Sequence, residues 1–122
     1  VTAMNALTVN LHLLMQSFYK PTKQRFKIII EAGAFPSDQY AVASQVTQYG
    51  IDVNKAVVEL TPRKGEKILR TEDIISQIEK HGNQLAMVML GGINYYTGQL
   101  FDIASITAAA QAQDAIAGWD LA

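Results

Sequence analysis

The stretch FKIIIEAGAFPSD (Phe26–Asp38) decides the fold that this sequence predicts. Its first half is short, mostly apolar and rich in β-branched residues, which is typical of a strand covered on both faces. Its second half is a turn that leads into a helix, where Val42 and Val46 share one face and Gly50 stands at the expected end. The stretch therefore predicts a strand–turn–helix unit whose strand is buried.

Similar units fill the rest of the chain. Further strands are expected over residues 56–60, 85–90 and 115–120, and further helices over residues 7–18, 71–81 and 103–113. Thr71 is expected to cap the second of these helices. Alternating helices and strands with short connectors predict an α/β fold, a three-layer αβα arrangement with a mostly parallel sheet in one domain over residues 1–122. In such folds, ligands bind where strands end and helices begin.

Composition excludes several classes of function. The 122 residues carry a formal net charge of −1, so no basic excess attracts nucleic acid or an anionic membrane. No apolar run approaches the ~20 residues of a membrane helix. Cysteine is absent, which excludes disulfides and zinc–cysteine sites and fits a cytoplasmic protein. His12 and His81 lie in unrelated positions, and no metal site is predicted.

Both ends of the sequence suggest a piece of a longer protein. The start, VTAMN (Val1–Asn5), has neither an initiator methionine nor the basic region of a signal peptide. The end, GWDLA (Gly118–Ala122), stops directly after an expected strand.

Two segments at the carboxyl ends of expected strands are candidates for binding a ligand. Asp120 is well placed to meet a ligand, and it could equally cap a helix that follows. Phe35 could offer a flat face to a ring, whereas a packed phenylalanine beside a capping Ser37 or Asp38 is the commoner arrangement. Tyr95 and Tyr96, in the loop after the expected strand at residues 85–90, could line a pocket or simply pack that loop.

A third candidate lies where the first helix begins. Backbone N–H groups at Leu7 and the hydroxyl of Thr8 could form a phosphate site, although a threonine without such a role is commoner at this position. No glycine-rich P-loop or dinucleotide fingerprint accompanies it.

Several of these stretches together resemble the kynureninase family of fold-type I enzymes that use pyridoxal 5'-phosphate (PLP). The matching stretches are NALTVNLHLLM (Asn5–Met15), AFPSDQYA (Ala34–Ala41), YYTGQLF (Tyr95–Phe101) and GWDLA (Gly118–Ala122). The resemblance implies that the chain is a central fragment of the PLP-binding large domain. The small C-terminal domain and the Schiff-base lysine would then lie beyond Ala122, and the fragment would hold no catalytic residue.

The resemblance also implies roles for the candidate residues. The cofactor-binding residues that it implies are Leu7, Thr8, Phe35, Pro36, Ser37, Asp38 and Asp120. Leu7 and Thr8 would bind the phosphate, and Phe35 would lie on the face of the pyridine ring. Asp120 would pair with the ring nitrogen, because a carboxylate there keeps it protonated and the ring able to accept electrons. Gly91 departs from the family, in which many members carry a serine that reaches the cofactor.

The implied activity of the full-length protein is hydrolysis of L-kynurenine or 3-hydroxy-L-kynurenine. The products would be anthranilate or 3-hydroxyanthranilate and L-alanine, in tryptophan catabolism and NAD biosynthesis. The family also implies a cytoplasmic homodimer, so several of Leu11, Leu13 and Leu14 should be exposed in this chain alone. Two alternatives remain: another fold-type I PLP enzyme, similar to cysteine desulfurases or transaminases, or a cofactor-free α/β binding module.

Overall fold

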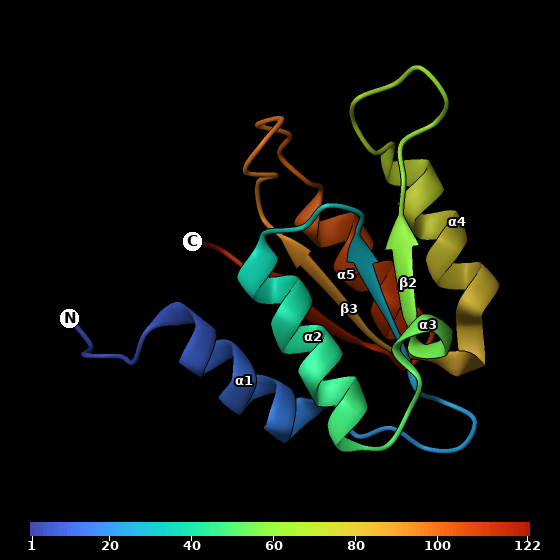
Figure 1. Cartoon of the computed structure of the whole chain (residues 1–122). Coiled ribbons are helices and arrows are strands. Elements are labelled where there is room, and N and C mark those ends of the chain that lie inside the picture. The colour runs from blue at the N-terminus through green and yellow to red at the C-terminus, as the bar shows by residue number, and fades with distance from the viewer.

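Four parallel strands form the sheet at the centre of the computed structural model, which describes residues 1–122 (Figure 1). The strands are β1 (Lys27–Glu31), β2 (Val57–Leu60), β3 (Leu85–Gly91) and β4 (Ile116–Asp120). Their order across the sheet is β2-β1-β3-β4, and every neighbouring pair is parallel. The predicted parallel sheet is confirmed.

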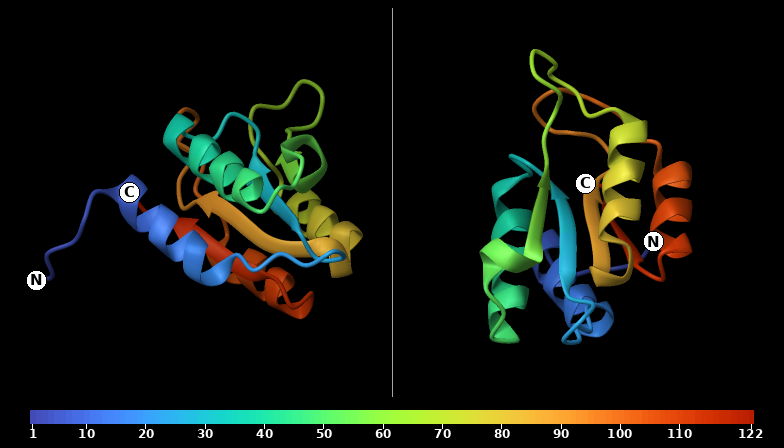
Figure 2. Two further views of the ribbon diagram at one scale, coloured as in Figure 1. Left: turned by 60° about the horizontal axis from the view of Figure 1, so that its bottom comes forward. Right: turned by 90° about the vertical axis from the view of Figure 1, so that its right-hand side faces the viewer.

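Helices cover both faces of this sheet. The main helices are α1 (Leu7–Phe18), α2 (Pro36–Gln48), α4 (Thr71–His81) and α5 (Ile103–Ala112). Helices α1 and α2 pack on one face, and α4 and α5 pack on the other (Figure 2, right). A short helix, α3 (Val53–Ala56), leads into β2, and a 3-10 turn, η1 (Gly82–Gln84), leads into β3. The three-layer αβα arrangement is therefore confirmed.

Burial on both faces explains the unbroken apolar run of β1. Ile28 and Ile30 pack among side chains of the α1 and α2 layer, while Ile29 packs among those of the α4 and α5 layer. All three are buried. Fully burying such a side chain contributes roughly 1.5–3 kcal/mol, so β1 holds the two helical layers together.

Two helix starts differ from the expected ones. Phe35 is the N-cap residue of α2 and makes no side-chain cap bond, so neither Ser37 nor Asp38 caps this helix. The prediction that Thr71 caps α4 is wrong as well, because Arg70 occupies the N-cap position and Thr71 is already helical. The carbonyl of Arg70 accepts the N–H groups of Asp73 and Ile74, which extends the helix by one residue.

The chain reverses its direction across the sheet between β1 and β3. From β1 it passes through α2 to β2 on one side, and α4 then carries it back to β3 on the other side of β1. The connections that leave β1 and β3 thus diverge over opposite faces of the sheet. Such a switch point opens a crevice beyond the carboxyl ends of the strands.

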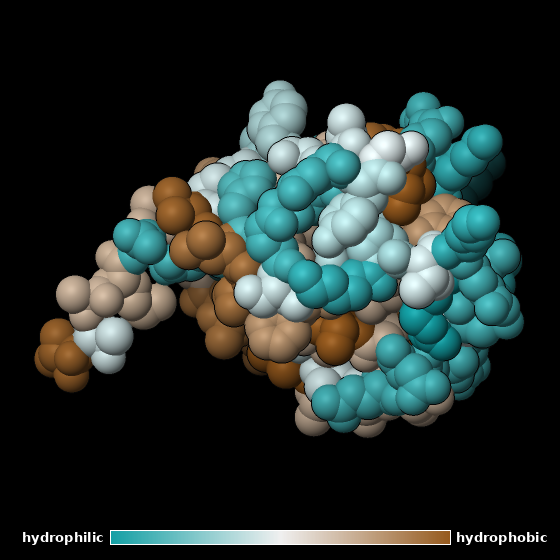
Figure 3. Space-filling model, turned by 90° about the horizontal axis from the view of Figure 1, so that it is seen from below, coloured by the Kyte–Doolittle hydropathy of each residue, from teal (hydrophilic) through white to brown (hydrophobic).

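Helix α1 exposes an apolar face. Leu11 is 7% exposed, whereas Leu13 and Leu14 are 54% and 56% exposed, as expected if this face is buried by further protein. Beside them an apolar groove of about 390 Å³ runs between α1 and β4 and includes Phe18 and Trp119. Figure 3 shows hydrophobic atoms (brown) gathered on the side of the N-terminal segment, opposite a mostly hydrophilic side. No helix combines the length and apolar character needed to cross a membrane.

Candidate functional site

A cavity of about 240 Å³ lies at the switch point of the sheet. The last residues of three strands line it: Glu31 from β1, Gly91 from β3 and Asp120 from β4. The remaining wall consists of Leu7, Phe35, Asp38, Ile93, Tyr95 and Ala122. The fold thus brings together the beginnings of two helices and the ends of three strands around one space.

Four of the seven residues predicted to bind a ligand line this cavity. They are Leu7, Phe35, Asp38 and Asp120. Phe35 and Asp120 therefore share a pocket at the carboxyl edge of the sheet, as predicted. The other three, Thr8, Pro36 and Ser37, lie in the first turns of α1 and α2 beside residues that do line it.

Glu31 is the site residue that sequence reasoning missed. It ends an apolar strand just as Asp120 does, so the same pattern could have identified it. Its side chain is only 5% exposed, and burial raises the pKa of its carboxyl. A hydrogen bond from Nδ2 of Asn94 to Oε2 of Glu31 (2.7 Å) partly offsets that rise.

Asp38 is the most strongly perturbed carboxyl in the cavity. Burial and, next, the neighbouring carboxylate of Asp120 raise the pKa of Asp38 to about 6. The hydroxyl of Ser37 donates to Oδ1 of Asp38 at 3.4 Å, which opposes this rise only weakly. Asp120 accepts a hydrogen bond from the backbone N–H of Ala122 at 2.9 Å, which holds its carboxyl at the end of β4.

No cation of the chain balances these three carboxyls. Neither lysine nor arginine lines the cavity, and all the ion pairs of the structure are made by Arg63 and Arg70 elsewhere. No group of residues has an arrangement suited to a metal ion. A cationic N–H group on a ligand would supply the missing positive charge.

Two further features of the cavity suit a ring that carries an anionic group. Phe35 is half exposed, and its ring meets that of Tyr95 edge to face with centroids 5.3 Å apart, which leaves an aromatic wall. Helix α1 begins at Leu7, and Ala6 at its N-cap provides no side-chain acceptor. The N–H groups of this first turn are therefore available to an anion.

Gly91, where the sequence resemblance implies a serine in many relatives, lies close to the loop after β3. A Cβ at this position would lie 3.2 Å from the carbonyl oxygen of Ile93 and 3.6 Å from Oε1 of Glu31. The loop after β3 would therefore crowd a side chain at position 91. A serine here would require the loop to move by a few tenths of an ångström.

Solved structures with this fold include PLP enzymes. The cysteine desulfurase from Thermococcus onnurineus covers 94% of this chain at a TM-score of 0.73 and 17% identity, over 26% of its own length. The PLP-bound C-S lyase from Staphylococcus hominis covers 94% of this chain at a TM-score of 0.65 and 13% identity, over 28% of its own length. The chain therefore has the α/β fold found in part of the fold-type I PLP-dependent enzymes.

Sequence comparison is more specific. Kynureninases match all 122 residues, with 65% identity in Myxococcus xanthus, 58% in Nematostella vectensis and 53% in Rattus norvegicus. The chain is thus homologous to kynureninases over its whole length, and it spans 29%, 26% and 26% of these three relatives. No protein-family model matches the chain.

Proposed function

We propose that this chain is the central part of the PLP-binding large domain of a kynureninase. The full-length protein would hydrolyse L-kynurenine or 3-hydroxy-L-kynurenine to anthranilate or 3-hydroxyanthranilate and L-alanine, within tryptophan catabolism and NAD biosynthesis. The observation that carries this proposal is the 53–65% sequence identity to kynureninases over all 122 residues of the chain. Identity to the desulfurase and lyase structures is only 13–17%, which favours kynureninase over those activities.

The carboxyls of the cavity fit the ring nitrogen of PLP. When bound, PLP supplies a protonated ring that withdraws electrons from the substrate. Asp120, at the end of β4, would accept the N–H of that ring and hold its proton in place. Asp38 would add a second negative charge beside it. A cationic ring would offset the burial and the repulsion from Asp120 that together raise the pKa of Asp38.

The other predicted residues fit the rest of the cofactor. Phe35 would lie against the ring face, and Pro36 and Ser37 would fix the backbone that positions it. Leu7 and Thr8 would bind the phosphate through the N–H groups at the start of α1 and the hydroxyl of Thr8.

The lysine that holds the cofactor would come from elsewhere in the full-length protein. No lysine lines the cavity, so these 122 residues alone would be inactive. The small C-terminal domain and the residues that bind the substrate would also lie outside the chain.

We also propose a cytoplasmic homodimer. The exposed Leu13 and Leu14 support burial of α1 against further protein. Size-exclusion chromatography with light scattering of the full-length protein tests the assembly, and a monomer would contradict it.

Titration of the full-length protein with PLP, followed by assay on kynurenine, tests the proposed activity. We expect a visible absorbance band from bound PLP and the appearance of anthranilate fluorescence. Cysteine, and pairs of an amino acid with a keto acid, serve as control substrates. A protein that binds PLP but turns over only a control substrate would be another PLP enzyme, and one without a visible band would be a binding module.

A further inference from the structure

The loop that follows β3 is organised around the side chain of Asn94. Oδ1 of Asn94 accepts hydrogen bonds from the backbone N–H of Tyr96 (2.9 Å), the N–H of Thr97 (2.7 Å) and the hydroxyl of Thr97 (3.0 Å). Ile93 and Leu100 form an antiparallel bridge at the base of this loop. Asn94 therefore determines the shape of the loop over residues 93–100.

Glu31 ties this loop to the sheet. Nδ2 of Asn94 donates to Oε2 of Glu31 at 2.7 Å, across 63 positions of sequence. The outer side of the loop is held separately, where the amide of Gln99 bonds the backbone N–H and C=O of Leu69. The contact between Glu31 and Asn94 is thus the inner anchor of the loop.

The residue after Asn94 forms one wall of the site. Tyr95 meets Phe35 edge to face at a centroid distance of 5.3 Å and an interplanar angle of 84°. Both Tyr95 and Glu31 line the 240 Å³ cavity as well as a second cavity of about 300 Å³ beyond it. The anchored loop is therefore the partition between these two spaces.

We infer that Glu31 is a positioning residue that holds Tyr95 against Phe35 through Asn94 and so fixes the aromatic wall of the site. In this role Glu31 acts through the loop. The inference rests on the proposed function for the identity of that ligand. A hydrogen bond to a charged, buried group is among the stronger ones, so loss of the acceptor should release the loop measurably.

The test compares four variants of the full-length protein by hydrogen exchange of residues 93–100 in the apo form and by PLP titration. Glu31→Ala removes the acceptor, and we expect exchange of the loop to rise roughly ten- to a hundredfold. PLP should bind several-fold more weakly. Asn94→Ala, made from the other side of the contact, should produce the same two effects. Glu31→Gln keeps an oxygen that can accept the hydrogen bond from Asn94, so hydrogen exchange of the loop and PLP affinity should both stay close to wild type.

The matched control is Glu59→Ala, which removes an exposed carboxylate from the neighbouring strand β2 and should change neither property. If Glu31→Ala leaves exchange of the loop unchanged, the inference is wrong. If Glu31→Gln weakens PLP binding as much as Glu31→Ala while the loop stays protected, Glu31 acts through its charge instead. A wild-type protein that binds no PLP would contradict the proposed function, while exchange in the apo form would still decide the role of Glu31.

Discussion

Two groups of carboxylates lie at the same edge of the sheet, and their surroundings affect them in opposite ways. The surface carboxylates, in the loop after β2 and the first turn of α4, are Glu66, Glu72 and Asp73. The cavity carboxylates, around the ends of β1 and β4 and the start of α2, are Glu31, Asp38 and Asp120. The first group has cationic partners within the chain, and the second has none.

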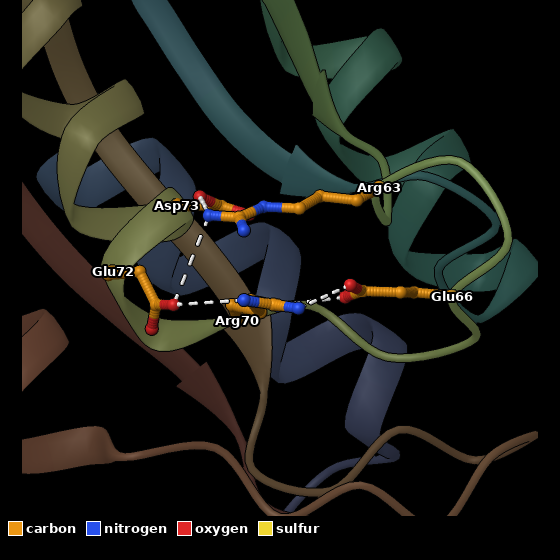
Figure 4. Close-up of polar contacts among 5 residues, drawn as sticks. All are labelled: Arg63, Glu66, Arg70, Glu72 and Asp73. Carbon is orange, nitrogen blue, oxygen red and sulfur yellow. Dashed lines mark hydrogen bonds and ion pairs between the residues drawn. The ribbon is translucent and has the colours of Figure 1, made fainter.

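The surface carboxylates are paired with arginines (Figure 4). Arg63 donates two hydrogen bonds to Asp73, at 2.7 Å and 2.6 Å, and Arg70 donates two to Glu66, at 3.0 Å and 2.5 Å. These bonds lower the pKa values of Asp73 and Glu66. Both carboxylates are stable as anions without any ligand.

In the cavity, the pKa values of two carboxylates shift upward instead. Burial raises the pKa values of Glu31 and Asp38, and Asp120 adds repulsion to Asp38. Such a group lowers the stability of the unliganded protein, which is common where residues serve binding rather than folding. The difference between the two groups supports the proposal that the cavity carboxylates bind a ring with a cationic N–H group.

The largest effect on stability is expected from Asp38→Asn. The folded protein binds more protons than the unfolded chain between pH 3.8, the ordinary pKa of an aspartate, and the folded pKa of about 6, so wild-type stability falls as pH rises through this window. The amide removes that loss, and the apo form should gain about 1–3 kcal/mol at pH 8 and nothing near pH 3. Thermal unfolding of the full-length apo protein at several pH values measures this gain.

The matched control for that change is Asp102→Asn at the N-cap of α5, where asparagine caps as well as aspartate. Its melting temperature at pH 8 should not rise, because hydrogen bonds from Ser105 already stabilise the charged form and lower the pKa of Asp102. Equal effects of both substitutions would show that Asp38 is not under electrostatic strain.

A moderate effect is expected from Phe35→Ala. Its ring is half exposed and makes part of the aromatic wall, so truncation should change apo stability little. Loss of an aromatic stacking contact should weaken PLP binding by about 1 kcal/mol, or roughly fivefold. Tyr40→Ala, an exposed aromatic of the same helix, should leave PLP affinity unchanged. Equal PLP affinities for wild type and Phe35→Ala would remove Phe35 from the ring face.

The smallest effect is expected from Arg63→Ala in the surface group. Exposed ion pairs contribute little, so the melting temperature should fall by no more than about 2 °C, and the difference should shrink in 1 M salt. PLP affinity should not change. A loss of PLP affinity here would mean that the two groups of carboxylates are coupled.

The fold could be predicted because its strands are apolar and its helices periodic. Short elements could not be predicted from periodicity. Helix α3 has four residues, too few to show a helical period. Asp52 caps this helix by accepting the N–H of Asn54 at 2.9 Å. The prediction that Thr71 caps α4 was wrong because residue type alone does not locate the start of a helix to within one residue.

The site could be predicted only in part, because the sequence does not state the order of the strands. Asp120 and Glu31 both end apolar strands, so the sequence pattern could have identified either one. Only the folded structure shows that Glu31 also meets Asn94, 63 positions along the chain. The sequence likewise does not show that no lysine or arginine lies beside Asp38. Only the folded structure shows that Arg63 and Arg70 are engaged elsewhere.

The proposed role of Asp120, at the end of β4, is to hold the proton on the ring nitrogen of PLP, and Asp120→Asn in the full-length protein tests this role most directly. Turnover of kynurenine and the melting temperature are measured on the same preparation. We expect the melting temperature to stay close to wild type and turnover to fall by two to four orders of magnitude, equivalent to ~3–5 kcal/mol of barrier. If Asp120 only caps a following helix, asparagine will replace it with near-normal turnover, and that result would contradict the account.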